Sequence, residues 1–468
     1  MPLGRLMPPL LLAGIVSLGL VLSGCDNQIV SSDNQQTANS ELPPKLLHSH
    51  LFKASLDNPT RPTQDGAIAK DGDEEEGDGP PLLIGFKNEE VSAYKVFRRY
   101  KVFRRYKVFR RYKELPGMHI IPKKGQPPIS EDVLNELLWR LNNDPDVEWI
   151  SPDLWLPRPS PLHGPRARHR DEIIPWGVDF IGAPSILNNL EGGYEGEERN
   201  DEETNQPVEL FLLDSGADSP DLNVVESVNF SDANKNKDRS GHGTNVAGLA
   251  AALNNGEGIQ GVAPSVRLFN MKVLGNGGDA ETSTIIAALD SVMARKEAHP
   301  NTPMVVNLSF GAQVGTSTYG ALDLAVEKAI QKGIVVVTAA GNGGQNVSTI
   351  SPAHVESAIT VGAHNRYHWF ASFSNYGSDI DLLAPGSSLT TLAPSRGAGK
   401  IRLENVSGTS LAAPQVAGAA VHYLSQHPTA TPGEVQKALV NRSRPIIFGA
   451  PDGTTNRSVW IGNLDHSY

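Results

Sequence analysis

Apolar residues along the C-terminal two thirds of the chain form short, nearly continuous runs separated by segments with helical spacing. The runs predict buried strands at residues 208–213, 266–273, 305–308, 334–338 and 359–361. Between some of them, residues 282–295 and 319–332 have the pattern of helices. Continuous apolar strands that alternate with helices are typical of a parallel sheet covered on both faces. We therefore expect an α/β domain at residues 173–468.

A smaller region at residues 81–157 has a different pattern. Strands are predicted at residues 82–86, 118–121 and 147–150, and an amphipathic helix is predicted at residues 130–141. This alternation indicates a small α+β unit.

The N-terminus predicts export. Arg5 precedes an apolar run of 13 residues, 10–22, which suits the core of a signal peptide and is too short to span a bilayer as a helix. The run ends just before Cys25, and residues 1–24 resemble a bacterial lipoprotein signal peptide that leaves Cys25 as the lipid-bearing first residue. An ordinary secretory signal followed by an incidental cysteine is the alternative.

Two polar stretches predict connecting segments. Residues 25–80 are poor in apolar side chains and include an acidic run at 71–78, so we expect a flexible acidic tether. A calcium site is the alternative for the acidic run. Residues 158–172 are rich in Pro and Arg and predict an exposed linker.

The hexapeptide Lys-Val-Phe-Arg-Arg-Tyr occurs three times in succession at residues 95–112. A six-residue period places its aromatic side chains around a helix and not along one face. We interpret the repeats as an expanded loop or helix end. Adhesion to anionic lipid or nucleic acid is the alternative, because the repeats carry nine positive charges.

Composition narrows the function classes. The 468 residues carry a formal net charge of −11, which argues against a nucleic-acid coat. A single cysteine excludes an intramolecular disulfide and any metal site that needs several thiolates.

Three segments carry side chains that suit nucleophilic catalysis. Asp214 ends an apolar strand, at the edge where parallel sheets place their sites. His242 lies between two glycines before a small-residue helix, and Ser410 precedes an apolar helix predicted at 412–424. Because proline fits the first turn of a helix, Pro414 places Ser410 at or just before the helix start. Each signal is weak alone, but the order Asp, His, Ser is one of the known triad orders.

These motifs identify the family. The segments around Asp214, His242 and Ser410, together with Gly341-Asn342, resemble those of the subtilase family of serine proteases, in particular its proteinase K-like branch. Residues 81–157 resemble the family's inhibitory propeptide, which implies a ferredoxin-like fold for them.

The resemblance implies a role for each matched residue. Ser410 would be the nucleophile, His242 the general base and acid, and Asp214 the group that orients the imidazole. Asn342 would donate a hydrogen bond to the developing oxyanion. Substrate would bind along two segments whose small residues leave an open apolar pocket: Ser309, Phe310 and Gly311, and Ala339, Ala340 and Gly341.

The resemblance also implies partners and cofactors. Substrates would be proteins or peptides, and the propeptide would inhibit the enzyme until it is cut between about residues 156 and 174, either by the enzyme itself or by another protease. No cofactor is needed for the chemistry. Asp381, with main-chain carbonyls near Glu356 and Ala358, matches a calcium-binding position of some relatives, and one carboxylate makes a weak site.

Together these expectations describe an exported serine endopeptidase, attached to a bacterial membrane through Cys25 and made as a zymogen. We expect no nucleic-acid partner. The alternative from another functional class is a catalytically silent surface protein that uses the same fold for binding.

Overall fold

The structure is a computed structural model, in which Leu42–Tyr468 form one compact unit. It describes residues 46–47, 81–87, 96, 99–100, 106–123, 129, 131–156, 162–163, 172–184, 207–233, 236–264, 266–315, 319–395 and 399–462. The predictions for the signal peptide, Cys25 and most of the tether concern residues outside the described set.

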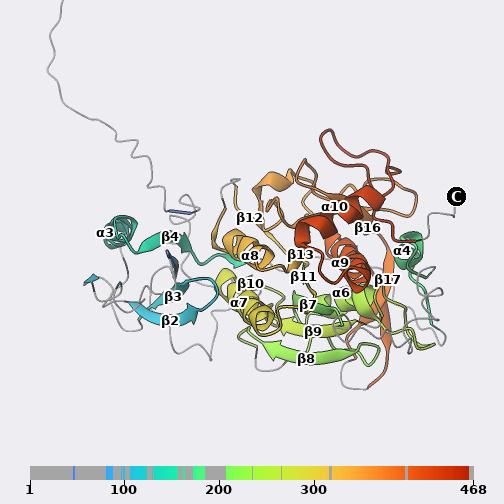
Figure 1. Cartoon of the computed structure of the whole chain (residues 1–468), viewed down its shortest axis with the longest axis horizontal. Coiled ribbons are helices and arrows are strands. Elements are labelled where there is room, and N and C mark those ends of the chain that lie inside the picture. Colours follow the sequence, from blue (N-terminus) through green and yellow to red (C-terminus); the bar gives the residue numbers. More distant parts are fainter. Residues whose placement is uncertain are drawn as a thin grey trace, which may run out of the picture. The chain divides into compact units, whose positions relative to one another are not determined.

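A seven-stranded sheet forms the centre of the large domain (Figure 1). Every neighbouring pair of strands runs parallel, in the order β16-β15-β13-β11-β7-β9-β8. The strands are β7 (Glu209–Asp214), β8 (Val224–Asn229), β9 (Arg267–Lys272), β11 (Met304–Leu308), β13 (Val335–Ala339), β15 (Ile359–His364) and β16 (Leu382–Pro385). The predicted α/β class is confirmed, and the five predicted strands form its middle. The edge strands β8 and β16 escaped prediction, because β8 is half exposed and β16 is only four residues long.

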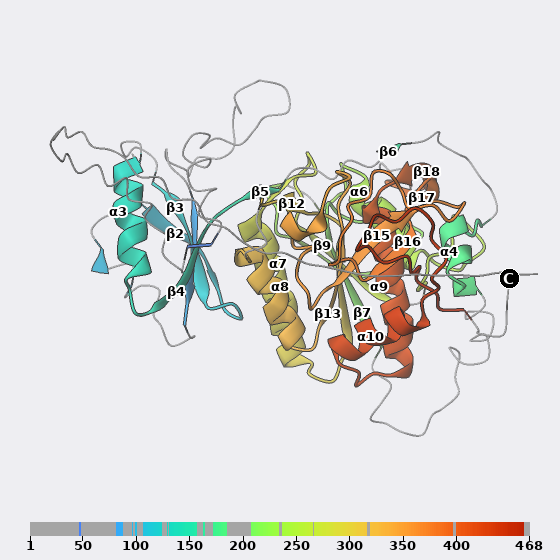
Figure 2. The same ribbon diagram turned by 90° about the horizontal axis from the view of Figure 1, so that it is seen from above.

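Helices cover both faces of this sheet (Figure 2). One face carries α7 (Thr282–Ala298) and α8 (Ala321–Gln331), which match the two predicted helices. The other carries α6 (His242–Ala251), α9 (Thr409–Gln426) and α10 (Pro432–Arg442). The two faces bury separate apolar clusters, as a sheet hydrophobic on both sides requires.

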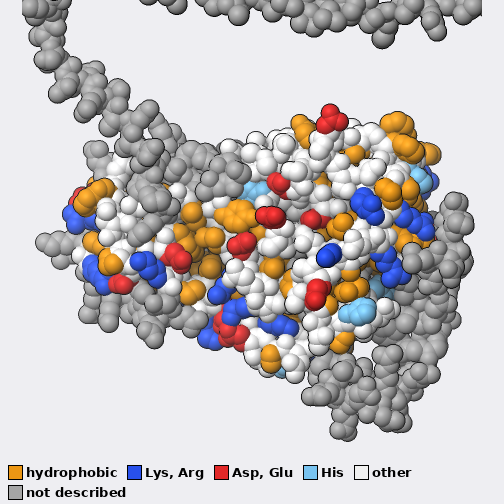
Figure 3. Space-filling view, turned by 45° about the horizontal axis from the view of Figure 1, so that its top comes forward, with side chains coloured by type: hydrophobic (Ala, Val, Ile, Leu, Met, Phe, Trp, Pro, Cys, Tyr) orange, Lys and Arg blue, Asp and Glu red, His pale blue; other side chains and the backbone are white. Residues whose placement is uncertain are grey.

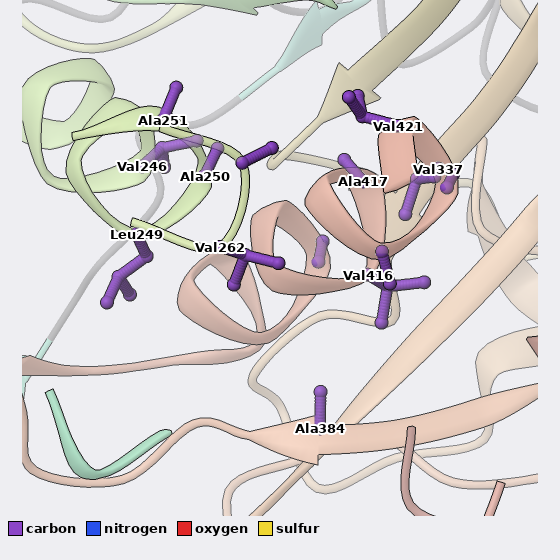
Figure 4. Close-up of a cluster of buried hydrophobic side chains, with 14 of the residues drawn as sticks. Val246, Leu249, Ala250, Ala251, Val262, Val337, Ala384, Val416, Ala417 and Val421 are labelled. Carbon is purple, nitrogen blue, oxygen red and sulfur yellow. The ribbon is translucent and has the colours of Figure 1, made fainter. Parts of the chain in front are cut away.

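Small side chains bring α6 and α9 close together (Figure 4). Ala250 and Ala417 face this contact, and Val262 lies between the helices. A Cβ atom on Gly418 would lie 2.7 Å from the Cβ of Val262, so a larger residue at 418 would push the helices apart. Both helices begin with residues predicted to be catalytic, so this packing sets the distance between their N-termini.

The smaller sheet is antiparallel, in the order β2-β3-β1-β4. It consists of β1 (Leu82–Phe86), β2 (Tyr106–Tyr112), β3 (Gly117–Pro122) and β4 (Val147–Pro152), with α3 (Glu131–Asn142) packed against it. The predicted strands and the predicted helix therefore exist.

The prediction that the repeats form an expanded loop or helix end is wrong for the third copy. The third copy, residues 107–112, lies within strand β2 and is neither a loop nor a helix end. A register shift between Val108 and Arg110 leaves Phe109 52% exposed. The buried residues Tyr106 and Tyr112 at the two ends hold the strand to the rest of the chain. Residues 101–105, in the second copy, are outside the described set.

The predicted linker is also partly wrong. Within it, β6 (Leu162–His163) pairs with β18 (Arg402–Ser407), which in turn pairs with β17 (Leu389–Ala393). Just before it, β5 (Trp155–Leu156) pairs antiparallel with β10 (Ala280–Glu281). The remaining short elements are α4 (Trp176–Phe180), β12 (Ala312–Gln313), β14 (Ile350–Ser351) and the 3₁₀ turn η2 (Val347–Thr349).

Acidic and basic side chains are intermixed on the face of the molecule that Figure 3 shows. None of the helices in the described part of the chain has the length and apolar character needed to cross a membrane.

Candidate active site

The carboxyl edge of the large sheet gathers the predicted site residues. Asp214 is the last residue of β7; the neighbouring strand β11 ends just before Ser309, and β13, the next strand beyond β11, ends at Ala339. Parallel strands present their carboxyl ends at one edge, so these residues face the same region. The Asp214 carboxylate is buried, and its Oδ1 accepts from the backbone N–H of Ser215 at 2.7 Å.

His242 is the first residue of α6 and is 2% exposed. Its Nδ1 lies 2.8 Å from Oδ1 of Asp214, and within the described part of the chain its Nε2 has no hydrogen-bond partner. The next residue must be small, because a Cβ on Gly243 would lie 2.1 Å from the carbonyl oxygen of Gly216. The glycine after the histidine therefore lets α6 begin directly against the end of β7.

A buried aspartate that the sequence did not single out holds this loop. Asp238 accepts from the backbone N–H groups of Gly241 and Thr244, at 2.7 and 2.9 Å. It also accepts from the hydroxyls of Thr244 and Ser215, at 2.7 and 2.9 Å. Burial raises the pKa of Asp238 above its usual value. The four donors oppose this effect, because they favour the ionised carboxylate.

Lys272 supports the same region from β9 and is completely buried. Its ammonium group donates to the carbonyl oxygen of Ser215. Burial lowers the pKa of Lys272, while the nearby Asp238 and Asp214 act in the opposite direction. In the sequence, the one feature that could have indicated the role of Asp238 is its position four residues before His242, the histidine between two glycines.

Ser410 is the second residue of α9, which begins at Thr409 and not at the predicted 412. The expected place of Ser410 is correct, but the argument from Pro414 is wrong, because this proline is the sixth residue of the helix and not in its first turn. Pro414 has no N–H to donate to the carbonyl oxygen of Ser410. Ser309 Oγ supplies that hydrogen bond at 3.0 Å and itself accepts from Asn307 Nδ2 at 2.8 Å.

Asn342 has a fixed amide orientation. Its Oδ1 accepts from the backbone N–H and from the hydroxyl of Thr409, at 2.8 and 2.9 Å, which directs Nδ2 the other way. A Cβ built on Gly408 would lie 3.4 Å from Asn342 Nδ2 and 3.7 Å from Ser410 Oγ. The two side chains thus converge beside the bare backbone of Gly408.

The other predicted binding residues have mixed positions. Phe310 is buried in the core next to α7 and α8, and a Cβ on Gly311 would lie 3.0 Å from the carbonyl oxygen of Ser351. Ala339 and Ala340 are also buried. Gly341 donates to Thr409 Oγ1 at 3.1 Å and has a φ of 99°, a region that favours glycine.

Asn375, for which the sequence predicted no role, holds the segment after β13 in place. Its Nδ2 donates to the carbonyl oxygen of Ala340 at 2.8 Å, and its backbone N–H donates to that of Gly341 at 2.9 Å. Its Oδ1 accepts from the backbone of Gly343 and Gln345, at 3.0 and 3.1 Å. These bonds occupy the carbonyl oxygens of Ala340 and Gly341, which are then not free to pair with the backbone of a substrate. Residues 339–341 are therefore better suited to form a wall of the substrate pocket than to pair with the substrate as a strand.

The end of the small sheet unit lies against the large domain near this site. Ser283 N donates to Asp153 Oδ1 at 2.9 Å, and Thr282 N donates to the carbonyl oxygen of Leu154 at 2.9 Å, so this segment satisfies donors in the first turn of α7. Leu154 and Leu156 line a small cavity together with Ala312. Further along, β6 pairs with Ser407, three residues before Ser410.

The residues around Asp381 do not fit a bound calcium ion as they stand. The side-chain amide of Gln436 donates to Asp381 Oδ1 and to the carbonyl oxygens of Ala358 and Glu356, so it occupies the predicted cation position. No cluster of three or more His, Cys, Asp or Glu residues suited to a metal ion occurs in the described parts of the chain.

Comparisons with known proteins agree with this geometry. A family model described as "Subtilase family" matches residues 170–461. Subtilisin E of Bacillus subtilis (strain 168) is 38% identical over 306 residues, covering 64% of this chain and 71% of the relative. A subtilisin of Bacillus pumilus is 40% identical over 275 residues, 57% of this chain and 90% of that protein. An extracellular serine proteinase of Thermus sp. (strain Rt41A) is 35% identical over 324 residues, 68% of this chain and 71% of the relative.

A solved structure supports the same conclusion. The crystal structure of a cold-adapted subtilisin-like serine proteinase matches with a TM-score of 0.50 and 31% identity, over 63% of this chain and 99% of the other. The family model covers well over half of the chain and includes Asp214, His242, Asn342 and Ser410. The chain therefore belongs to the subtilase family and is a serine peptidase with the subtilisin-like fold.

Proposed function

We propose that the chain is a serine endopeptidase in which Ser410 attacks the scissile carbonyl, His242 takes and returns the proton, and Asp214 orients the imidazole. The observation that carries this proposal is the 2.8 Å contact between His242 Nδ1 and Asp214 Oδ1 in a buried setting. With the Nδ1 proton directed to the carboxylate, the lone pair of Nε2 is available to accept the serine proton.

The proposed roles of these groups define the steps. Attack by Ser410 Oγ on the peptide carbonyl forms a tetrahedral intermediate, and the serine proton moves to His242 Nε2. The negative oxygen accepts from Asn342 Nδ2 and from the backbone N–H of Ser410. The imidazolium then protonates the leaving amine, and a water molecule that His242 activates hydrolyses the acyl-enzyme.

The substrate pocket should accept apolar side chains. The predicted walls of this pocket are residues 309–311 and 339–341, and neither segment carries an acidic side chain. The small residues in these walls leave room for a large side chain of the substrate. We propose a preference for hydrophobic or aromatic residues before the cut.

We propose that residues 81–157 are an inhibitory propeptide. Three contacts support this role: β5 pairs with β10, Asp153 accepts from the start of α7, and β6 pairs with Ser407. Leu156 also lines a cavity with Ala312, which directly follows the predicted substrate segment 309–311. Cleavage between about residues 156 and 174 would release it. We further propose that a lipid on Cys25 anchors the exported precursor to a bacterial membrane.

The proposal is tested with a fluorophosphonate probe, which labels only an activated serine. We expect labelling of the wild type and none of Ser410→Ala or His242→Ala. Ser410→Ala should also accumulate as a full-length lipoprotein, and normal processing of this variant would show that another protease makes the cut. A purified wild-type protein that remains unlabelled after the propeptide is removed would favour the alternative, a catalytically silent binding protein.

A further inference from the structure

One amide nitrogen lies at the centre of three oxygen atoms near the edge of the large sheet. Nε2 of Gln436, on α10, lies 2.9 Å from Asp381 Oδ1, 3.1 Å from the carbonyl oxygen of Ala358 and 3.3 Å from that of Glu356. Asp381 directly precedes β16, and Ala358 directly precedes β15. The contact therefore ties a C-terminal helix to the starts of two adjacent strands.

The number of oxygens exceeds what the amide can satisfy well. A primary amide has two hydrogens, so three acceptors around one nitrogen must share them. All three oxygens point to a single position, and they combine one carboxylate with two carbonyls. This is a set of hard oxygen ligands, which suits a calcium ion supplemented by water.

The carboxylate has no charged partner in this arrangement. Its other oxygen, Oδ2, accepts from the backbone N–H of Thr360 at 2.8 Å, and no ion pair to Asp381 occurs among the described residues. A partly buried carboxylate that is compensated only by dipoles would gain from a cation at the same position.

We propose that Gln436 stands in for a metal ion: its side-chain amide closes an oxygen cage formed by Asp381, Ala358 and Glu356, and removal of the amide opens a calcium site there. In this chain α10 is thus held to the sheet by an internal donor and needs no cation at this point. The inference is independent of the proposed catalytic function.

The helix that carries Gln436 is well anchored without it. Thr431 and Glu434 form a reciprocal capping box at the start of α10, and Pro432 occupies its first turn. Val435 and Leu439 are buried in the core on that face of the sheet. Truncation of Gln436 should therefore empty the cage without detaching the helix.

The test measures thermal unfolding of the full chain in a Ser410→Ala background, which prevents self-digestion. In a chelator, Gln436→Ala should lower Tm by about 2–4 °C, the effect of leaving a partly buried carboxylate and two carbonyls without their donor. In about 5 mM calcium, a concentration above the Kd of weak sites, Gln436→Ala should recover more Tm than the parent gains under the same change.

Two controls make the result specific. The double variant Gln436→Ala/Asp381→Asn should lose the extra calcium response, and Lys437→Ala, an exposed neighbour on α10, should behave as the parent. The proposal is overturned if Gln436→Ala responds to calcium no more than the parent, or if the double variant responds equally.

A second variant covers the case in which Gln436→Ala does not fold in a chelator. Gln436→Glu places a second carboxylate in the cage, so this protein should require calcium for folding and should bind terbium, a luminescent calcium analogue, with a stoichiometry one higher than that of the parent. Equal stoichiometry in the two proteins would contradict the proposal.

Discussion

Ser309 Oγ donates a hydrogen bond to the carbonyl oxygen of Ser410 at 3.0 Å, where an intrahelical bond from residue 414 would otherwise be. Pro414 lacks the N–H for that bond, so the first turn of α9 is held from outside, by the end of β11. The serine predicted to be the nucleophile is thereby coupled to the central sheet through Ser309 and Asn307.

Ser309→Ala should lower kcat and leave KM nearly unchanged. The change leaves the Ser410 carbonyl and the Asn307 amide without their buried partner, which costs about 1–3 kcal/mol of stability. Because the hydroxyl points to Ser410, we expect a fall in kcat of roughly tenfold with little change in KM. Steady-state kinetics on a peptide with an aromatic residue before the cut would separate the two. A raised KM with an unchanged kcat would instead identify Ser309 Oγ as a substrate contact.

Asp238→Asn should weaken the loop that carries His242. An asparagine offers one acceptor oxygen where the aspartate accepts four hydrogen bonds, so part of the support for the start of α6 is lost. We expect a loss of about 2–3 kcal/mol of stability, since bonds to charged groups are the strong ones, together with a lower kcat.

Asp221→Asn is a matched control for this change. Asp221 is also buried, but it accepts from Asn255 and from the backbone of Ile259, away from His242. It should lower stability without a specific loss of kcat. Equal kinetic defects in the two variants would show that Asp238 acts only through global stability.

Local sequence was sufficient to predict the middle of the large sheet and the position of Ser410 near the start of a helix, but not the residue at which that helix begins. The apolar runs of β11 and β13 are long enough to stand out, and glycines mark the start of α6 at His242. The supporting residues could not be predicted, because their partners are far away in sequence. Gln436 meets Asp381 from 55 residues away, and Ser309 meets Ser410 from 101 residues away.

The repeats illustrate the same limit. In the first copy, Arg99 and Tyr100 bind Asp144, at 2.8 and 2.6 Å, and Val96 is buried under helix α3 and the small sheet. In the third copy the same hexapeptide lies in strand β2. Since identical residues take part in two different structures, tertiary contacts and not local preference decide the outcome.

His364 should make the fold sensitive to acid. The imidazole is completely buried between Trp176 and Phe180, its Nδ1 lies 2.9 Å from the carbonyl oxygen of Asn365, and its Nε2 lies 2.8 Å from Ser458 Oγ. Burial lowers the pKa of His364 to about 4. The unfolded chain takes up a proton near pH 6.5, whereas the folded protein does so only near pH 4. Stability should therefore fall as the pH decreases through this window, by on the order of 3 kcal/mol.

Urea unfolding of the Ser410→Ala protein at several pH values between 7.5 and 4 measures this loss. His364→Gln keeps polar groups near Asn365 and Ser458 but cannot take up the proton. It should be less stable than its parent at pH 7.5 and lose less stability on acidification. Parallel pH dependences in the two proteins would mean that other groups, such as the buried His422, dominate the acid response.

Asp290→Ala should weaken the contact between the small sheet unit and α7. Asp290 Oδ1 accepts from three consecutive backbone N–H groups after β2, those of Lys113, Glu114 and Leu115, at 3.1, 2.5 and 3.3 Å. Beside it, Lys332 pairs with Glu114 at 2.7 Å. Burial alone would raise the pKa of Glu114, but the hydrogen bonds to this carboxylate, led by that from Lys332, lower it to about 2. Loss of the Asp290 carboxylate removes a charge-assisted acceptor worth about 2–2.7 kcal/mol, which corresponds to a roughly 30- to 100-fold weaker complex.

If residues 81–157 act as a propeptide, the cleaved but unseparated protein should therefore regain activity at a 30- to 100-fold higher concentration in Asp290→Ala than in the wild type. Recovery of peptidase activity on serial dilution measures this dissociation directly. The exposed Asp452 provides a control of the same charge on the peptidase surface, and Asp452→Ala should leave the dissociation unchanged. Within the described residues, Asp290 accepts hydrogen bonds from the turn after β2 and none from the triad, so the fully dissociated Asp290→Ala enzyme should have the wild-type kcat. A variant with reduced kcat and unaltered dissociation would show that α7 supports the active site and not the bound propeptide.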